Sequence, residues 1–220
     1  SAHMRYEVPH LFHVFVENGY CVRAFSEVPD LLSGLGWKFN LLDGLDDALV
    51  VSENCPTILF LHYWQTHVPY GATDSRAYGE TLELLKQGDL DIVRGRYELA
   101  VRRVFEREIS RVLGKIDLDH WCVIIFGDHG ESWSYDEPYH GLSLRNSVLR
   151  IPLYFHIPGS GNPIPPQGIL SMVDILPTIA GIFELPLDYR GFGLDLRQPS
   201  TSRHCLAQID PVASDVKPNE

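Results

Sequence analysis

The sequence predicts an α/β fold in three layers, with a mainly parallel sheet flanked by helices. Two apolar runs, Thr57–Tyr63 and Trp121–Phe126, have the length of buried strands. A longer segment between them, from about Asp89 to Gly114, repeats its apolar residues with the period of a helix. Because strand-length runs alternate with helix-period segments along the chain, a layered α/β domain is the favoured architecture.

Length and composition indicate one globular domain. The 220 residues include 45% apolar and 21% charged residues, a balance that disordered and fibrous chains do not have. No stretch of 18 apolar residues is present, so the sequence predicts no membrane span. Residues 1–4 (SAHM) are typical of an expression-tag remnant. We expect the α/β domain over 5–197 and a partly loose extension over 198–220.

The chain is acidic, with 18 Lys and Arg against 29 Asp and Glu and a net charge of −11. Its surface therefore lacks the positive charge that binding to nucleic acid or to an anionic membrane requires. The four cysteines are widely spaced and form no C-x-x-C pair, so we expect reduced, buried thiols and a cytoplasmic protein. They are Cys21, Cys55, Cys122 and Cys205.

The first third of the chain supplies a helix, a short strand, two helical turns and a buried strand. Residues 9–18 (PHLFHVFVEN) have helical spacing and stop at Gly19, a common C-terminal signal. Residues 57–63 are continuously apolar, as in a strand that is covered on both faces. The expected elements, in order, are 9–18, 20–25, 30–36, 43–50 and 56–63.

The segment from about Asp89 to Gly114 predicts the longest helix. Its apolar residues form one stripe at period 3.6, and charged residues occupy the opposite face. We interpret that face as a solvated helix surface and not as a basic binding strip. The stripe contains Tyr97, Val101, Val104, Phe105, Ile109, Val112 and Leu113.

The last elements follow the second buried strand, 121–126, which ends at Gly127. Residues 151–157 predict a third strand, and the Pro- and Gly-rich stretch 158–168 predicts a surface loop. Residues 170–183 predict a helix whose first turns contain Pro177.

Polar clusters follow the two most apolar strands. The first is 62–70 (HYWQTHVPY), and the second is 127–132 (GDHGES) with 139–141 (YHG) further along. In an open α/β sheet, ligands bind beyond the carboxyl ends of the strands. If both strands are parallel, the two clusters share one edge of the sheet and face each other.

Asp128 and His129 offer a carboxylate oxygen and an imidazole nitrogen between two glycines. Such a mixed pair suits zinc or manganese better than calcium, which prefers oxygen ligands alone. Taken alone, the pair would be interpreted as an Asp at the end of a strand followed by a surface His. The two flanking glycines, the buried strand before them and His140 eleven residues on favour a metal site instead. His62 can be interpreted equally well as a histidine of the core or as a functional residue. His67, which lies in a polar loop beside Pro69 and Tyr70, is interpreted as a functional residue. Glu131 fits a supporting or helix-starting residue.

These motifs resemble the sulfatase branch of the alkaline phosphatase superfamily. The resemblance is carried by 123–132 (VIIFGDHGES), by 139–141 and by 172–182 (MVDILPTIAGI), whose D-x-L-P-T string is similar to a late helix of that family. Asn18–Tyr20 and Leu149–Leu153 are further similar segments. His62, His67, Pro69 and Tyr70 are similar to the substrate-side histidine loop of phosphoethanolamine transferases and related sulfatases. Together these segments extend the match over roughly Pro9 to Leu196.

The resemblance implies an alkaline phosphatase-like fold and a divalent metal held by Asp128 and His129. Zinc or manganese is expected, with calcium or magnesium as alternatives. His67 and His140 would be catalytic residues that hold an oxygen of the anionic ester substrate, or a second metal. His62 and Tyr70 would lie on the substrate side with them.

The sequence departs from the family at its beginning. The family's nucleophile is a Thr, a Ser or an oxidised Cys, and it lies in an N-terminal third that also supplies acidic metal ligands. Here no apolar strand ending in Asp precedes Tyr20, and no Cys-x-Pro-x-Arg string occurs. We therefore expect a truncated domain with no assigned nucleophile, whose site a second chain or a homo-oligomer would complete.

The expected function is metal-dependent hydrolysis or transfer of a phosphate or sulfate ester. Two alternatives stay open: a non-catalytic binding or partner subunit, and a pocket redirected to other metal chemistry in a biosynthetic pathway. Absence of bound metal in the purified protein, together with no thermal shift at saturating zinc, would remove the first function.

Overall fold

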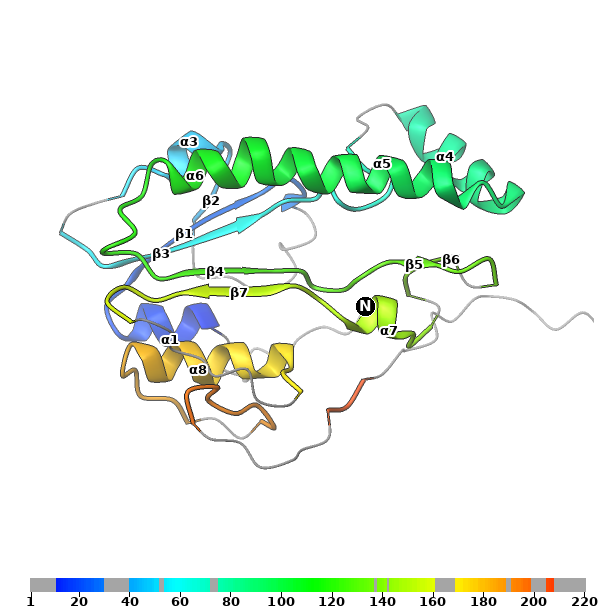
Figure 1. Ribbon diagram of the computed structural model, residues 1–220. Coiled ribbons are helices and arrows are strands. Elements are labelled where there is room, and N and C mark those ends of the chain that lie inside the picture. Colours follow the sequence, from blue (N-terminus) through cyan, green and yellow to red (C-terminus); the bar gives the residue numbers. More distant parts are fainter. Residues whose placement is uncertain are drawn as a thin grey trace, which may run out of the picture.

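The computed structural model describes residues 11–29, 40–51, 54–71, 75–136, 138–141, 143–160, 169–188, 191–198 and 205–207. They form a mixed α/β fold with small sheets (Figure 1). The predicted turn at 30–36, most of the loop at 158–168 and most of the extension at 198–220 lie outside these residues.

Three parallel strands form the first sheet, in the order β2-β1-β3. They are β1 (Cys21–Ser26), β2 (Asn40–Leu42) and β3 (Thr57–His62). The register of β1 and β3 runs from Cys21 opposite Thr57 to Ser26 opposite His62. The strands predicted at 20–25 and 56–63 are therefore confirmed, and the structure shows them as parallel neighbours, although every residue of β3 is only half-buried.

The strands predicted around residues 121–126 and 151–157 form a separate, antiparallel pair. They are β4 (Val123–Phe126) and β7 (Leu153–His156). A smaller antiparallel pair, β5 (Ser132–Trp133) and β6 (Pro138–Tyr139), follows β4. The prediction of a mainly parallel sheet is wrong here, because the chain returns directly from β4 through α7 (Asn146–Leu149) without a crossover helix.

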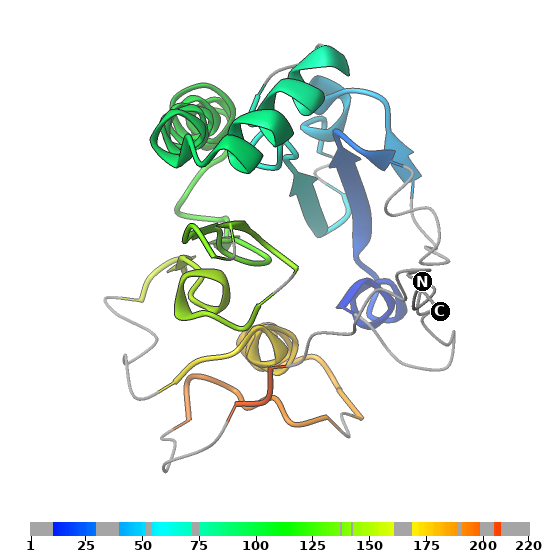
Figure 2. The ribbon, with the colours of Figure 1, turned by 90° about the vertical axis from the view of Figure 1, so that its right-hand side faces the viewer.

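Helices lie on both sides of the strands (Figures 1 and 2). One side carries α3 (Leu45–Ala48), α4 (Ser75–Gln87), and a long helix made of α5 (Leu90–Arg103), a π segment (Val104–Ile109) and α6 (Ser110–Leu113). The other side carries α1 (Leu11–Glu17) and α8 (Ile175–Ile182), the latter preceded by a 3₁₀ turn (Met172–Asp174).

The two larger sheets rest on one apolar cluster from α1 and α8. Its buried members are Phe15, Ile175 and Ile179. One side chain from each of β1, β3, β4 and β7 packs against these three residues. In that order they are Val22, Ile58, Ile124 and Leu153. The sheets therefore lie side by side over the same helices, although β3 and β4 exchange no ladder hydrogen bonds.

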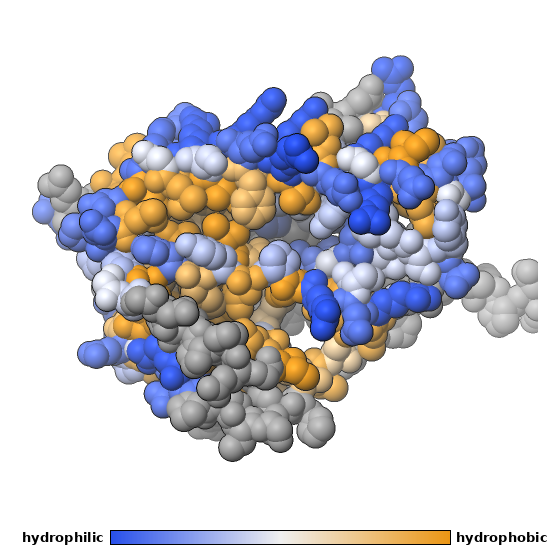
Figure 3. Space-filling model, viewed as in Figure 1, coloured by the Kyte–Doolittle hydropathy of each residue, from blue (hydrophilic) through white to orange (hydrophobic). Residues whose placement is uncertain are grey.

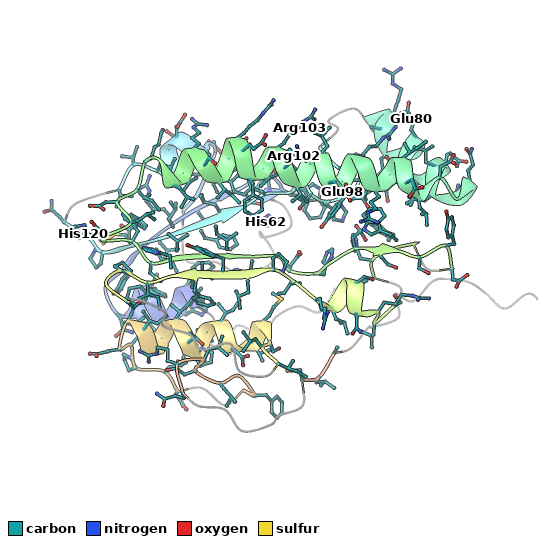
Figure 4. The ribbon with its side chains drawn as sticks, in the orientation of Figure 1. His62, Glu80, Glu98, Arg102, Arg103 and His120 are labelled. Carbon is teal, nitrogen blue, oxygen red and sulfur yellow. A yellow bond between two sulfur atoms is a disulfide. The ribbon has the colours of Figure 1, made fainter. Side chains whose placement is uncertain are left out.

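The long helix is confirmed, but its apolar stripe is not continuous as predicted. Val104 and Val112 are buried, whereas Phe105 is 48% exposed. The π segment at Val104–Ile109 explains the difference, because its i→i+5 hydrogen bonds change the phase of the side chains around the helix axis. Arg102 and Arg103 project away from the strands, as a solvated face requires (Figure 4).

Cys21 and Cys55 form a disulfide, so the prediction of four reduced thiols is wrong. The parallel register places Cys21 opposite Thr57, two residues beyond Cys55, and thereby brings the two sulfurs together. Cys122 is a half-buried thiol, as predicted, and burial raises its pKa to about 11. Cys205 is an exposed thiol and not a buried one.

Among the described residues, no helix is both long and apolar enough to cross a membrane.

Candidate functional site

The two polar clusters meet in one pocket. His62 is the last residue of β3, and Asp128 follows the end of β4 by two residues. The loops after these strands supply nearly all of the pocket wall, and the long helix adds Tyr97. The lining residues are His62, Tyr63, Trp64, Thr66, His67, Tyr97, Asp128, His129, Gly130 and Glu131. Figure 4 shows His62 under the long helix, and His120 far away at the opposite end of the strands.

All four candidate imidazoles are held through the same ring atom, Nδ1. His67 Nδ1 donates to the Val68 carbonyl (2.9 Å), His129 Nδ1 to the Gly130 carbonyl (2.9 Å) and His140 Nδ1 to the Glu131 carboxylate (3.1 Å). His62 Nδ1 lies 2.8 Å from Ser26 Oγ. For His67, His129 and His140, whose partners can only accept, the donor at Nδ1 leaves Nε2 unprotonated in a neutral imidazole, which is the form that binds metals and accepts protons.

Asp128 and His129 face each other at the mouth of the pocket. Asp128 Oδ1 accepts the His129 backbone N–H (2.9 Å), and Asp128 Oδ2 lies 3.7 Å from His129 Nε2. Since His129 Nδ1 already donates to a carbonyl, neutral His129 turns a lone pair toward a carboxylate. Two acceptors in this arrangement call for a cation or a proton between them.

The donor pair fits one edge of a metal's coordination shell. Ligands at 2.0–2.1 Å in tetrahedral geometry are roughly 3.3 Å apart, close to the 3.7 Å between the two donors. A third donor is not in reach: within the part of the chain that the structure describes, no group of three His, Cys, Asp or Glu side chains could hold an ion. The described residues therefore fit part of a metal site.

Glu131 is the buried centre of a hydrogen-bond network under the pocket. Its side chain is 4% exposed. It accepts from Tyr70 Oη (3.0 Å) and from His140 Nδ1. Tyr70 is itself 5% exposed, so its hydroxyl serves the carboxylate and does not reach the open pocket. Burial and the neighbouring Glu131 carboxylate raise the pKa of Tyr70.

His140 packs behind the pocket wall and not in it. Its ring lies 4.1 Å from the His129 ring, 5.0 Å from the His67 ring and 3.8 Å from the Tyr139 ring, centroid to centroid. Tyr139 Oη in turn lies 3.3 Å from His67 Nε2. The structure therefore brings His140 next to both loops, where it orders their imidazoles.

Burial lowers the pKa of both histidines of the first loop. For His62, the nearby Asp128 and Glu27 carboxylates act in the opposite direction but are outweighed by desolvation. For His67, desolvation is again the largest cause, and the neighbouring His140 and His129 lower the pKa further. Both imidazoles are therefore neutral near pH 7.

Unusual backbone conformations gather around the site. Three non-glycine residues of the described chain have positive φ, and two of them, Tyr70 (60°) and Tyr139 (80°), belong to the site. Such conformations cost energy and often occur at functional positions.

Gly130 has a packing role that the sequence does not reveal. A Cβ at Gly130 would lie 2.0 Å from the Ser147 carbonyl oxygen of α7, and the Gly130 N–H donates to the Val148 carbonyl (2.7 Å). A Cβ at Gly127 would make only ordinary contacts, the nearest at 3.5 Å. The glycine after His129 is thus required by contact with a helix, and not by the approach of an ion.

Sequence reasoning missed several residues that shape the site. The supporting role that the sequence allows for Glu131 agrees with its hydrogen bonds to Tyr70 and His140, but its burial follows only from the fold. Trp64 stacks on His67 with ring centroids 3.8 Å apart, and Ser26 and Glu27 contact the same loop. Their partners are 36 and 37 residues away in sequence, so local spacing carried no signal.

Comparison with protein-family models, with curated proteins and with solved structures finds no match to this chain.

Proposed function

We propose that the chain is a sulfatase-like, metal-dependent hydrolase or transferase that acts on a phosphate or sulfate ester. One observation carries the proposal: the polar loops after β3 and β4 line a single pocket. The alkaline phosphatase-like, three-layer arrangement belongs to the same proposal, and the helices on both sides of the strands support it (Figure 2).

Asp128 and His129 would hold the metal ion, with zinc or manganese favoured by the mixed oxygen and nitrogen donors. When bound, such an ion would polarise the ester. His62 and His67, neutral because of burial, lie on the opposite wall, where His62 would orient an oxygen of the anion through an Nε2–H. His140 acts through its contacts with His67 and His129.

The attacking group is open to a direct test. Thr66 is the only aliphatic hydroxyl residue among the pocket-lining residues of the described chain. Loss of turnover in Thr66→Val would make this hydroxyl the nucleophile, whereas retained turnover would make water the attacking group.

A second chain or a homo-oligomer would supply the remaining metal donors. Two observations support this part of the proposal. The described residues provide two donors where a closed shell needs more. In addition, Figure 3 shows a band of exposed apolar side chains between the long helix and β4, a surface typical of protein contacts.

The Cys21–Cys55 disulfide bears on where the protein works. Disulfides persist in oxidising compartments and are rare in the cytosol. A cytoplasmic location was predicted from reduced cysteines, and we propose an oxidising compartment in its place.

The proposal is tested by metal titration and hydrolysis with the same preparations. Calorimetry with ZnCl₂ and with MnCl₂ should show binding to the unaltered protein, and none to Asp128→Ala or His129→Ala. Asp119→Ala is the matched control, because this exposed carboxylate precedes β4 at its other end. p-Nitrophenyl phosphate and p-nitrophenyl sulfate then report turnover in the metal-loaded protein, and light scattering reports its mass.

No heat of binding at saturating zinc or manganese would overturn the proposal. Binding without turnover would favour the alternative of a non-catalytic metal- or anion-binding subunit. The incomplete donor set is the observation that keeps this alternative.

A further inference from the structure

Two consecutive residues at the end of β1, Ser26 and Glu27, contact the loop that carries the first cluster. The parallel register places Ser26 directly opposite His62, the last residue of β3. The β1 strand therefore ends beside the loop and can act on it from behind the pocket wall.

Ser26 contacts the ring of His62. Ser26 Oγ lies 2.8 Å from His62 Nδ1 and also accepts the Val28 backbone N–H (3.1 Å). Because the oxygen already accepts one hydrogen bond, its own proton can be donated to Nδ1. With the hydroxyl as the donor, the imidazole proton of neutral His62 lies on Nε2.

The position of Ser26 argues against a role as nucleophile. The residue is 6% exposed and does not line the pocket, whereas His62 does. A nucleophile must reach the reacting atom of the substrate. The hydroxyl lies behind the imidazole, where it can orient the ring.

Glu27 contacts the backbone of the same loop. Its Oε2 accepts the N–H groups of Trp64 (2.6 Å) and Gln65 (3.2 Å), and its Oε1 accepts Gln65 Nε2 (2.6 Å). Trp64 stacks on the His67 ring at 3.8 Å. One carboxylate thus fixes the turn from which the stacked pair of rings projects.

We infer that Ser26 and Glu27 are positioning residues: Ser26 sets the proton of His62 on Nε2, and Glu27 holds the Trp64–His67 stack against the pocket. Their relevance to turnover rests on the proposed function, but their effect on the two imidazoles does not. Charge-assisted hydrogen bonds such as those of Glu27 are about twice as strong as neutral ones.

Nitrogen NMR of ¹⁵N-histidine-labelled protein tests the Ser26 part without any substrate. We expect the Nε2–H tautomer for His62 in the unaltered protein and a changed tautomer ratio in Ser26→Ala. Ser26→Thr keeps the hydroxyl and should restore the original spectrum. Ser110→Ala is the control, because that hydroxyl bonds to the Phe105 carbonyl on the far helix. An unchanged His62 spectrum in Ser26→Ala would overturn this part.

The same spectra test Glu27. Glu27→Ala should shift the His67 ring signals as the tryptophan stack loosens, and Glu27→Gln, which keeps one acceptor, should shift them less. Unaltered His67 signals in Glu27→Ala would overturn the Glu27 part.

Kinetics then separate this inference from the proposed function. In an active preparation, Glu27→Ala should raise KM for p-nitrophenyl phosphate about tenfold and change kcat little, since a bound group is misplaced but not removed. Equal kinetics despite shifted spectra would contradict a positioning role in turnover. Failure of the unaltered protein to hydrolyse either ester would contradict the proposed function alone.

Labelling with a fluorophosphonate, which reacts with nucleophilic serines, tests the opposite role for Ser26. If the unaltered protein is labelled and Ser26→Ala is not, Ser26 is a nucleophile and the inference is overturned.

Discussion

Asp174 is fully buried, and both of its carboxylate oxygens accept backbone N–H groups. Oδ2 accepts from Ser171 (2.7 Å) at the start of the 3₁₀ turn, and Oδ1 accepts from Leu194 (2.9 Å). Thr178, four residues on, accepts the Leu196 N–H (3.0 Å). The D-x-L-P-T string therefore has a structural role, which is to fasten the 194–196 segment to α8.

Asp174→Ala should lower the free energy of unfolding by about 2 kcal/mol, because two partly buried N–H groups lose their acceptor. Asp174→Asn, which keeps a carbonyl oxygen, should lose less. Urea denaturation measures both, with Asp119→Ala as an exposed control. A change within about 0.5 kcal/mol for Asp174→Ala would contradict the fastening role.

At the scale of residues, the sequence predicted the members of the pocket better than their supports. His62, His67, Asp128 and His129 could be found because polar residues that directly follow buried strands form a local pattern. Glu131 could be named as a supporting residue, but its buried position could not be predicted, because it depends on Tyr70, which is 61 residues away in the chain.

At the scale of elements, the second polar loop and α7 form one packed unit. The Gly130 N–H donates to Val148, and the backbone of Ser147 occupies the space where a side chain at Gly130 would begin. Any displacement of Asp128 and His129 must therefore involve α7.

Gly130→Ala should destabilise the fold and weaken zinc binding, because backbone would have to move by more than a few tenths of an ångström. We expect a loss of about 1–3 kcal/mol in the free energy of unfolding, as for other overpacked sites. Gly127→Ala is the matched control and should cost less, since its new methyl group meets ordinary contacts. Equal losses in thermal or urea denaturation would contradict the packing argument.

The positions of the main strands and helices could be predicted from periodicity, but their pairing could not. The strands at 57–62 and 123–126 were visible as apolar runs, whereas the antiparallel return of 153–156 depends on the path of the intervening chain. Helix α4 was missed. Its sequence contains Gly79, a poor helix former, and its burial is limited to one side around Ala77 and Thr81.

At the scale of the whole molecule, the disulfide closes a loop between the starts of two paired strands. Cys21 and Cys55 are 34 residues apart in sequence. Closing a loop of this length restricts the unfolded chain and stabilises the folded one by about 3–4 kcal/mol on the chain-entropy account.

Thiol titration with Ellman's reagent should find two thiols in denatured, unreduced protein and four after reduction. In the native protein, exposed Cys205 should react fast and Cys122 slowly, because burial raises its pKa to about 11. Cys21→Ser with Cys55→Ser should lower the denaturation midpoint, whereas Cys205→Ser should not. Four thiols without reductant would show that the bridge is absent and remove the argument for an oxidising compartment.

The two walls of the pocket belong to different sheets, and β3 and β4 are both edge strands. Ladder hydrogen bonds consequently do not set the width of the pocket; it is set by the packing of Ile58 and Ile124 on the α1–α8 cluster and by side-chain hydrogen bonds such as Tyr70–Glu131. Shear between the two sheets can open or narrow the pocket without breaking a ladder bond. Such a shift would repack the core and would also strain the Tyr70–Glu131 hydrogen bond, which joins the two loops of the pocket.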